Sequence, residues 1–237
     1  MTADKSQYVW KKVHSLMGIL PLGMYLCMHL FLNSFVLLGK GSFTDGIALL
    51  HRMPYLPVLE WGMIYIPLAI HVVLGIIMIF DARYNTIRYG YSRNWWFWFQ
   101  RMSAVLVFAF IVWHVYTTRV QLMLGNVEVD GFYELLQAQF QHPLWLAFYI
   151  VGISAAALHF GNGIWGFLVS WGVLTSRRSQ RAFAGVCIAF GALVLAGFVN
   201  VAYHYSSGKS EGGIIPLVEG EAVHASPAQV TTVEILD

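Results

Sequence analysis

Residues 14–34 read HSLMGILPLGMYLCMHLFLNS, an apolar run with one histidine, His29, set well inside it. About 20 helical residues are needed to cross the hydrocarbon core of a bilayer, and lipid tolerates only helices or closed barrels as spanning structures. The run is longer than the apolar core of a cleavable signal peptide, which has about 7–15 residues, and no small-residue cleavage site follows it. We therefore interpret it as the centre of a first transmembrane helix.

Four more apolar runs of similar length follow, and the composition agrees with them. Hydrophobic residues make up 58% of the 237 residues and charged residues only 11%, whereas a soluble domain has roughly a quarter of its residues charged. We expect an all-α membrane protein with five transmembrane helices in a bundle, formed by residues 1–205, and an extramembrane C-terminal tail, 206–237. The expected spans are 15–38, 58–80, 102–123, 144–174 and 182–205.

Basic residues predict the orientation. With the N-terminus in the cytoplasm and the C-terminus outside, ten of the 14 lysines and arginines fall on the cytoplasmic side of the cell membrane. These ten are Lys5, Lys11, Lys12, Arg83, Arg88, Arg93, Arg101, Arg177, Arg178 and Arg181, and the other four are Lys40, Arg52, Arg119 and Lys209. Trp95, Trp96 and Trp98 would form an interfacial belt, and a short surface helix is expected around 132–136. No basic patch outside the short loops supports nucleic-acid binding.

One histidine lies well inside each of the first four spans: His29, His71, His114 and His159. An ionisable side chain at membrane depth is unfavourable and marks function by default. Because successive helices run in opposite directions at about 1.5 Å per residue, His29 and His114 should lie level on the outer side, and His71 and His159 level on the inner side. Two pairs at two depths are what two bis-histidine haems require, with one axial nitrogen from each face.

Other interpretations of these residues are possible. A single histidine could be a packing residue bonded to a carbonyl. Zinc or di-iron sites would need histidines at one depth together with carboxylates, whereas the span interiors carry no Asp or Glu. Cys27 and Cys187 form no CxxC pair, which excludes cysteine-ligated clusters within this chain. The glycines near the histidines could admit a porphyrin or serve ordinary helix packing; they are Gly18, Gly23, Gly75, Gly161 and Gly163. At the inner span ends, His14, Ser15 and Arg101 could bind haem propionates, although Arg101 also fits the cytoplasmic excess of basic residues.

Four stretches carry a family resemblance: residues 14–34, IYIPLAIHVVLGI (64–76), QRMSAVLVFAFIVWHV (100–115) and HFGNGIWG (159–166). Together they resemble the single-chain, dihaem cytochrome b anchor of succinate dehydrogenase and fumarate reductase complexes. The resemblance covers about residues 8–205, and the order and spacing of the histidines make it specific.

The resemblance implies a subunit that anchors a flavoprotein subunit and an iron–sulfur subunit at the cytoplasmic face, around residues 81–101 and 175–181. Electrons would pass between the iron–sulfur subunit and a quinone, expected to be menaquinone, through two haems b. The physiological direction, succinate oxidation in the tricarboxylic acid cycle or fumarate reduction, stays open. The chain has no flavin or cluster motif of its own, so it would not oxidise a dicarboxylate alone.

The resemblance also implies the haem ligands. In the family the outer haem pairs the histidines that match His29 and His114, and the inner haem those that match His71 and His159, which is the pairing that the depths indicate. Some family members carry a glutamate, proposed to return protons across the membrane, two residues before the match to His159. Here that position is Ala157, which puts such a route in doubt.

We place the expected quinone site near the outer haem. Glu60 is the only carboxylate at the outer mouth of the first two spans, which makes it the candidate for proton transfer. Asn33 and Ser34, about one turn past His29, could bond the quinone headgroup. Alternatively, Glu60 is a solvated interfacial acid and Asn33 a helix C-terminal cap, or the quinone binds at an inner site beside the iron–sulfur subunit.

Two competing functions use the same histidines. The chain could be the cytochrome b subunit of a formate dehydrogenase or hydrogenase, although the pattern of one histidine per helix argues against it. It could also be a proton-coupled transporter with a histidine relay, which would contain no haem.

Overall fold

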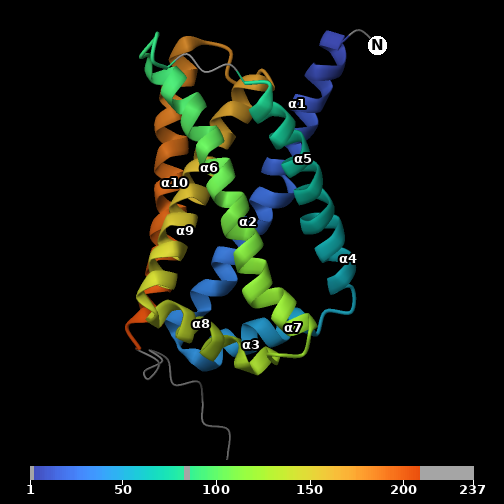
Figure 1. Cartoon of the computed structure of the whole chain (residues 1–237), viewed down its shortest axis with the longest axis vertical. Helices are drawn as coiled ribbons and strands as arrows, with labels where there is room; N and C mark the ends of the chain where they lie inside the picture. The colour runs from blue at the N-terminus through green and yellow to red at the C-terminus, as the bar shows by residue number, and fades with distance from the viewer. Residues whose placement is uncertain (1–2, 83–85, 209–237) are drawn as a thin grey trace, which may run out of the picture.

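Five long helices run side by side along the long axis of the molecule (Figure 1), in a computed structural model that describes residues 3–82 and 86–208. Each is long and apolar enough to cross a membrane. Every regular element of the described residues is helical, so the prediction of an all-α chain with five candidate spans is confirmed. The spans are Lys5–Leu38, Leu56–Phe80, Ser92–Met123, Pro143–Ser170 and Arg177–Ser206.

The elements follow one another with short connections. In chain order they are α1 (Ala3–Ile19), α2 (Pro21–Ser34), a 3-10 turn (Phe35–Leu38), α3 (Lys40–His51), α4 (Leu56–Glu60), a π-helix (Trp61–Tyr65), α5 (Ile66–Phe80), α6 (Ser92–Val115), a second π-helix (Tyr116–Val120), α7 (Gln121–Met123), a second 3-10 turn (Val129–Gly131), α8 (Phe132–Gln141), α9 (Pro143–Ser170) and α10 (Arg177–Ser206). Pro21 divides the first span into α1 and α2 because proline has no N–H to donate within a helix.

Most span limits differ from the predicted ones, because hydropathy marks only the part of a helix that can cross lipid. The first, third and fifth spans begin earlier than predicted, since their helices continue into polar sequence. The fourth ends at Ser170 and not at 174. There Gly172 takes a left-handed conformation with φ of 77°, and its N–H bonds the Val169 carbonyl at 3.2 Å, which terminates α9. Ser176 then caps α10, its side chain accepting from the N–H of Ser179.

Two short helices, α3 and α8, cross one end of the bundle (Figure 1), which we call the capped end. The surface helix predicted around 132–136 is confirmed as α8, whereas α3 was not predicted. Lys40 of α3 forms an ion pair with Glu134 of α8, and this hydrogen bond lowers the pKa of the Glu134 carboxyl. The main cluster of buried residues lies beneath these helices: Val36, Phe43, Tyr133, Leu136, Phe140, Tyr149, Ile153, Val201, Ala202 and Tyr205.

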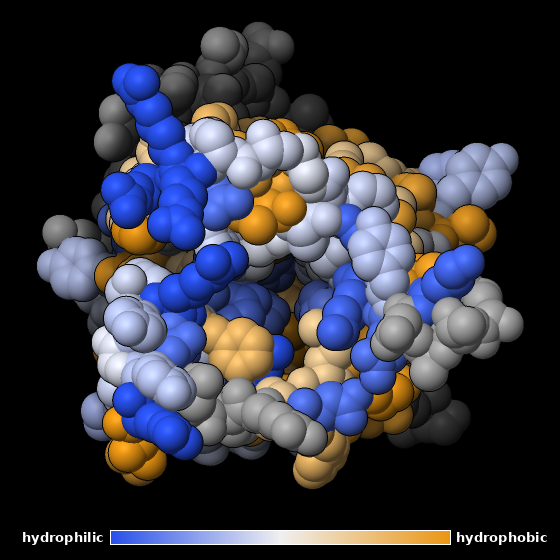
Figure 2. Space-filling view, turned by 90° about the horizontal axis from the view of Figure 1, so that it is seen from above, coloured by the Kyte–Doolittle hydropathy of each residue, from blue (hydrophilic) through white to orange (hydrophobic). Residues whose placement is uncertain are grey.

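The opposite end carries the start of α1 and the loops that follow α5 and α9, and we call it the N-terminal end (Figure 1). Figure 2 looks onto this end and shows a hollow bordered by hydrophilic side chains. The start of α1 and the end of α10 lie at opposite ends, as an odd number of spans requires. The cytoplasmic placement of the N-terminal end stays a prediction. Arg83 and the expected tail from Lys209 onward lie outside the described residues.

Helices α9 and α10 approach closely at two glycines. A Cβ atom on Gly161 would lie 2.9 Å from the Cys187 carbonyl oxygen, and one on Gly191 would lie 3.0 Å from the Ala157 carbonyl oxygen. Both distances are shorter than an ordinary contact. Close backbone approach at small residues is the usual way in which helices associate within lipid. Gly161 was expected to serve either helix packing or the approach of a porphyrin. Its contact with the Cys187 carbonyl gives it a role in helix packing.

We expect Gly191→Leu to force α9 and α10 apart and to lower stability by about 1–3 kcal/mol, the usual effect of overpacking. Thermal unfolding of the detergent-solubilised protein would measure the loss. Gly185→Leu is the matched control on the same helix, because a Cβ at Gly185 meets no atom within 4 Å. Equal losses in the two variants would contradict the role of the glycine contact.

Candidate functional site

The structure brings the four in-span histidines together as two pairs. The rings of His29 and His114 have centroids 5.8 Å apart with an interplanar angle of 77°. The rings of His71 and His159 have centroids 6.1 Å apart at 89°. These are the two pairs expected from the depths. The described residues hold no group of three or more His, Cys, Asp or Glu side chains that could share a metal ion.

The two pairs lie at different levels of the bundle. Gln100, whose side chain contacts His159, and His114 are both on α6, 14 residues or about 21 Å apart along the helix axis. His14, which contacts His71, and His29 are 15 residues apart in the first span. The first span and α6 thus give a similar separation between the two histidine pairs. The pair of His71 and His159 lies toward the N-terminal end, and the pair of His29 and His114 toward the capped end.

The spacing within each pair suits a single bound metal atom. Bonds from a metal to an imidazole nitrogen are about 2 Å long, so two imidazoles on opposite sides of one metal have ring centroids about 6 Å apart. Both observed separations are close to this distance. Each pair could therefore hold one metal between its two rings, with the rings nearly perpendicular to each other.

Hydrogen bonds orient three of the four rings. Nδ1 of His71 lies 2.9 Å from the His14 carbonyl oxygen, and Nδ1 of His159 lies 3.1 Å from the Gln100 carbonyl oxygen. A carbonyl only accepts, so these two bonds place the proton on Nδ1 and leave the lone pair on Nε2. The Gln100 side-chain amide nitrogen also lies 3.2 Å from Nδ1 and 3.5 Å from Nε2 of His159. Ligating histidines commonly use their second nitrogen in this way, which fixes both the tautomer and the ring orientation.

His114 is oriented through a chain of side chains that reaches the capped end. Its Nδ1 lies 3.2 Å from the Tyr149 hydroxyl, and that hydroxyl donates to Oε1 of Gln139 at 2.7 Å. Because the single hydroxyl proton goes to Gln139 of α8, the Tyr149 oxygen accepts from His114 Nδ1. His29 makes ring contacts with Tyr25, at a centroid distance of 5.6 Å, and with Phe198, at 6.0 Å.

His14 and the nearby glycines shape the surroundings of His71. The His14 and His71 rings stack at 3.9 Å and 13°, and His14 Nδ1 donates to the His71 carbonyl at 3.0 Å. A Cβ on Gly18 would lie 2.5 Å from the His71 ring, and one on Gly75 would lie 3.2 Å from the His14 ring. These glycines leave room for the two rings where α1 meets α5. Gly23 leaves room for Phe160 in the same manner.

The other residues expected to bind propionates lie at the N-terminal end. Arg101 donates to the Phe97 carbonyl at 3.0 Å, and its guanidinium lies 3.4 Å from the centre of the Phe97 ring. It is close enough to His14 for their charges to interact. Ser15 accepts a hydrogen bond from Nε1 of Trp171 at 3.1 Å and donates to the Lys12 carbonyl. His14 and Arg101 therefore share a neighbourhood, whereas Ser15 is engaged with the end of α9.

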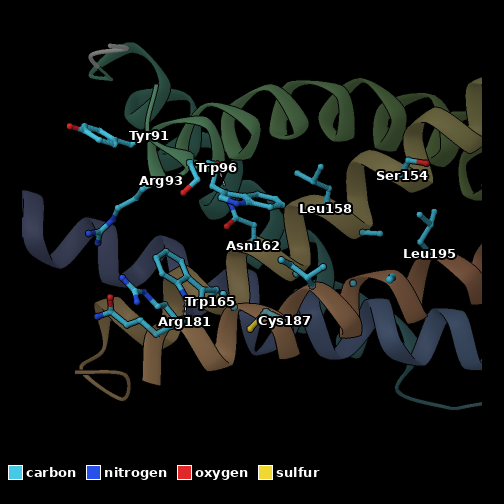
Figure 3. A pocket seen from close by; sticks show the side chains of 18 of the residues that line it. Tyr91, Arg93, Trp96, Ser154, Leu158, Asn162, Trp165, Arg181, Cys187 and Leu195 are labelled. Atoms are coloured by element: carbon cyan, nitrogen blue, oxygen red, sulfur yellow. Dashed lines mark hydrogen bonds between the residues drawn. The ribbon is translucent and has the colours of Figure 1, made fainter. Parts of the chain in front are cut away.

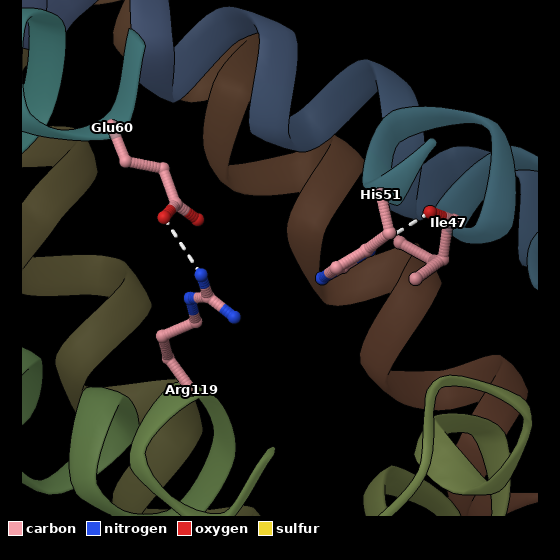
Figure 4. A network of polar contacts seen from close by, with 4 residues as sticks. All are labelled: Ile47, His51, Glu60 and Arg119. Atoms are coloured by element: carbon pink, nitrogen blue, oxygen red, sulfur yellow. Dashed lines mark hydrogen bonds and ion pairs between the residues drawn. The ribbon is translucent and has the colours of Figure 1, made fainter. Parts of the chain in front are cut away.

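At the capped end, Glu60 forms an ion pair with Arg119 (Figure 4). The distance from Arg119 Nη2 to Glu60 Oε2 is 2.7 Å, and the Glu60 side chain is only 15% exposed. Glu60 is therefore not a fully solvated acid. The sequence had indicated Arg119 only as one of four basic residues outside, and the structure shows it as the partner of the candidate carboxylate.

The Glu60–Arg119 pair lies at two π-helices and near two tyrosines. Glu60 directly precedes the first π-helix, and Arg119 lies within the second; such segments occur frequently at functional sites. The Tyr65 side chain approaches the Arg119 guanidinium, and Tyr25 is close enough to interact with all three side chains. Arg119 Nε is buried and has no hydrogen-bond partner among the described residues. A buried donor of this kind is expected to meet a partner from outside the chain.

Asn33 and Ser34 are turned back onto their own helix. The Asn33 side-chain amide donates to the His29 carbonyl at 2.8 Å, and the Ser34 hydroxyl donates to the Phe31 carbonyl at 2.6 Å. Both donors are thus used locally. Tyr25, Tyr65, Gln100, Gln139 and Tyr149 were missed from the sequence, although Gln100 could have been noticed as an amide at the edge of an apolar run.

Comparisons with known proteins agree with this architecture. Residues 84–199 match the protein family described as succinate dehydrogenase/fumarate reductase transmembrane subunit. The chain is 35% identical over 175 residues to the succinate dehydrogenase cytochrome b558 subunit of Bacillus subtilis (strain 168), a match that covers 74% of this chain and 85% of that protein. No solved structure matches the chain. By this similarity, over most of the length of both proteins, the chain belongs to the family of succinate dehydrogenase/fumarate reductase transmembrane subunits.

Proposed function

We propose that the chain binds two haems b and passes electrons between an iron–sulfur subunit and a quinone in a succinate dehydrogenase or fumarate reductase complex. The proposal rests on the two histidine pairs. In each pair the ring centroids lie about 6 Å apart, and the two pairs lie at different depths in the bundle. His29 with His114 would hold the outer haem, and His71 with His159 the inner one. A haem with two histidine ligands supplies a one-electron carrier.

The residues around the pairs have distinct tasks in this proposal. The carbonyls of His14 and Gln100 hold the inner histidines in the tautomer that keeps Nε2 available, and Tyr149 does the same for His114. Arg101, which lies near His14, would supply positive charge at the N-terminal end, where an anionic propionate would be neutralised.

We place the quinone site at the Glu60–Arg119 pair. Arg119 Nε is a buried donor that can bind a quinone carbonyl oxygen, and Glu60 can transfer a proton to or from that oxygen. Tyr25 contacts both the His29 ring and the surroundings of the pair, so a headgroup bound there lies beside the outer haem ligands. The quinone is expected to be menaquinone, on the strength of the family resemblance.

The partners follow from the same proposal. A flavoprotein subunit and an iron–sulfur subunit would bind at the N-terminal end, around residues 81–101 and 175–181, on the cytoplasmic face of the cell membrane. The chain would be inactive toward succinate or fumarate without those subunits.

We expect two low-spin haems b per chain in a pyridine haemochrome assay of the purified complex. His71→Ala and His159→Ala should each remove the inner haem, because each deletes one of the two histidines that would hold it. His142→Ala is the control, since His142 is exposed and belongs to neither pair. A count of one haem would contradict the proposal, and a count of none would favour the transporter. Loss of the same optical component in His71→Ala and His29→Ala would overturn the pairing.

Glu60→Gln should lower quinone-linked turnover by about 100-fold or more, the usual contribution of a general acid or base. Succinate oxidation by an artificial acceptor at the soluble subunits should persist, and the haem content should stay intact. Glu128→Gln is the matched control, because Glu128 is an exposed carboxylate close to the same end. Unchanged quinone turnover would remove Glu60 from the mechanism and move the site to the N-terminal end.

Tyr149→Phe should raise the midpoint potential of the outer haem and leave that of the inner haem unchanged. The acceptor on His114 Nδ1 makes the imidazole a stronger electron donor, which favours the oxidised iron. A redox titration followed optically would measure both potentials, with Tyr203→Phe as a control on the exposed face of α10. An equal shift of both haems would argue for a general structural effect.

A further inference from the structure

A groove with a volume of about 870 Å³ runs between α6, α9 and α10, and none of the four paired histidines lines it. Figure 3 shows its residues on three helices, with α9 between the start of α6 and α10. The groove follows α10 from Arg181 to Leu195, which is 14 residues or about 21 Å along the helix axis. Its volume is in the range of about 300–1,000 Å³ that small-molecule sites occupy.

One end of the groove is strongly basic. Arg93, Arg177 and Arg181 line it at the N-terminal end, and all three side chains are exposed. The ion pairs among the described residues are Lys40–Glu134 and Arg119–Glu60, so none of the three arginines is neutralised by a described carboxylate. Among the described residues, no acidic side chain lines the groove. The N-termini of α6 and α10 open onto the same end and add to its positive potential.

The amide side chains of the groove are already engaged. Asn162 donates to the Trp96 carbonyl and to Oε1 of Gln100, and Gln180 donates to the Leu174 carbonyl at 3.0 Å. The Trp165 Nε1–H donates to the Gln180 carbonyl at 2.9 Å. A neutral headgroup would find these donors occupied. The guanidinium groups are the charged donors that line the groove, and they favour an anion.

The other end of the groove is apolar. Leu158, Ile188 and Leu195 line it, and in Figure 3 Leu158 and Leu195 lie well away from Arg93 and Arg181. The groove therefore has a basic end near the N-termini of α6 and α10, and its apolar part extends toward the middle of the bundle. This is the distribution that an amphipathic molecule with an anionic head and a hydrocarbon chain requires.

We propose that the groove binds one anionic phospholipid, with its phosphate at Arg93, Arg177 and Arg181 and an acyl chain along Leu158, Ile188 and Leu195. Basic pockets between transmembrane helices on the cytoplasmic side commonly bind anionic headgroups. A quinone has a neutral head, which would leave the charge of the three arginines uncompensated. Arg178, on the same helix turn, does not line the groove, so the general excess of basic residues at this end does not account for the arrangement.

The test uses the complex purified in detergent and stripped of lipid. Phosphatidylglycerol or phosphatidylcholine, with identical acyl chains, is then added as the probe, and native mass spectrometry measures which lipid stays bound. We expect one phosphatidylglycerol to be retained per chain and phosphatidylcholine to be lost. Arg93→Gln combined with Arg181→Gln should weaken phosphatidylglycerol binding about fivefold for each arginine removed. Arg88→Gln combined with Arg178→Gln is the matched control and should bind as the unaltered protein does.

A second pair of variants tests the apolar length. Ala192 lines the groove and is exposed, so Ala192→Trp should fill it and displace the acyl chain without entering the protein core. Ala189→Trp, exposed on the same helix outside the groove, should have no effect. Three results would overturn the proposal: equal retention of the two lipids, arginine variants that bind as tightly as the controls, and retention of a quinone that only Ala192→Trp displaces. Loss of the soluble subunits from the arginine variants, with lipid binding unchanged, would instead make these arginines a protein contact.

Discussion

A histidine inside the hydrocarbon region has two polar ring nitrogens that water cannot reach, and the arrangement of this bundle follows from that constraint. His71 binds the His14 carbonyl while His14 binds the His71 carbonyl, so α5 and α1 are joined by two hydrogen bonds and a ring stack. His159 is joined to α6 at Gln100 in a similar way. Gly18 has to be small because the His71 ring occupies the space of its side chain. In each case a carbonyl of a neighbouring helix satisfies one ring nitrogen.

Much of this architecture could be predicted from the sequence. The five spans follow from hydropathy, and the pairing of His29 with His114 and of His71 with His159 follows from the constant rise of a helix, since depth depends only on residue number. The small helix α3 could not be predicted. Its twelve residues include two glycines and only a short amphipathic face, and it is held by packing against α8 and the helix ends.

Contacts between side chains of different helices could not be predicted either, because they depend on how each helix is rotated about its own axis. Glu60 and Arg119 are 59 residues apart, and their ion pair requires two spans to be rotated toward each other at π-helices that no sequence pattern marks. The partner of His114, Tyr149, required the facing residues of α6 and α9 to be known. Ala157, where some family members carry a carboxylate, is buried at the contact of α9 with α10. Its carbonyl lies against Gly191, so this part of α9 serves helix packing.

The two ends of the bundle differ in how closely their side chains are packed. Tyr133, Tyr205, Phe43 and Val36, the largest fully buried side chains, all belong to the cluster under α3 and α8. The N-terminal end is hollow and bordered by hydrophilic side chains (Figure 2). The bundle thus resembles a cup with a closed base. In the proposed function, a flat group that enters through this hollow passes the level of His71 and His159 before it reaches the level of His29 and His114.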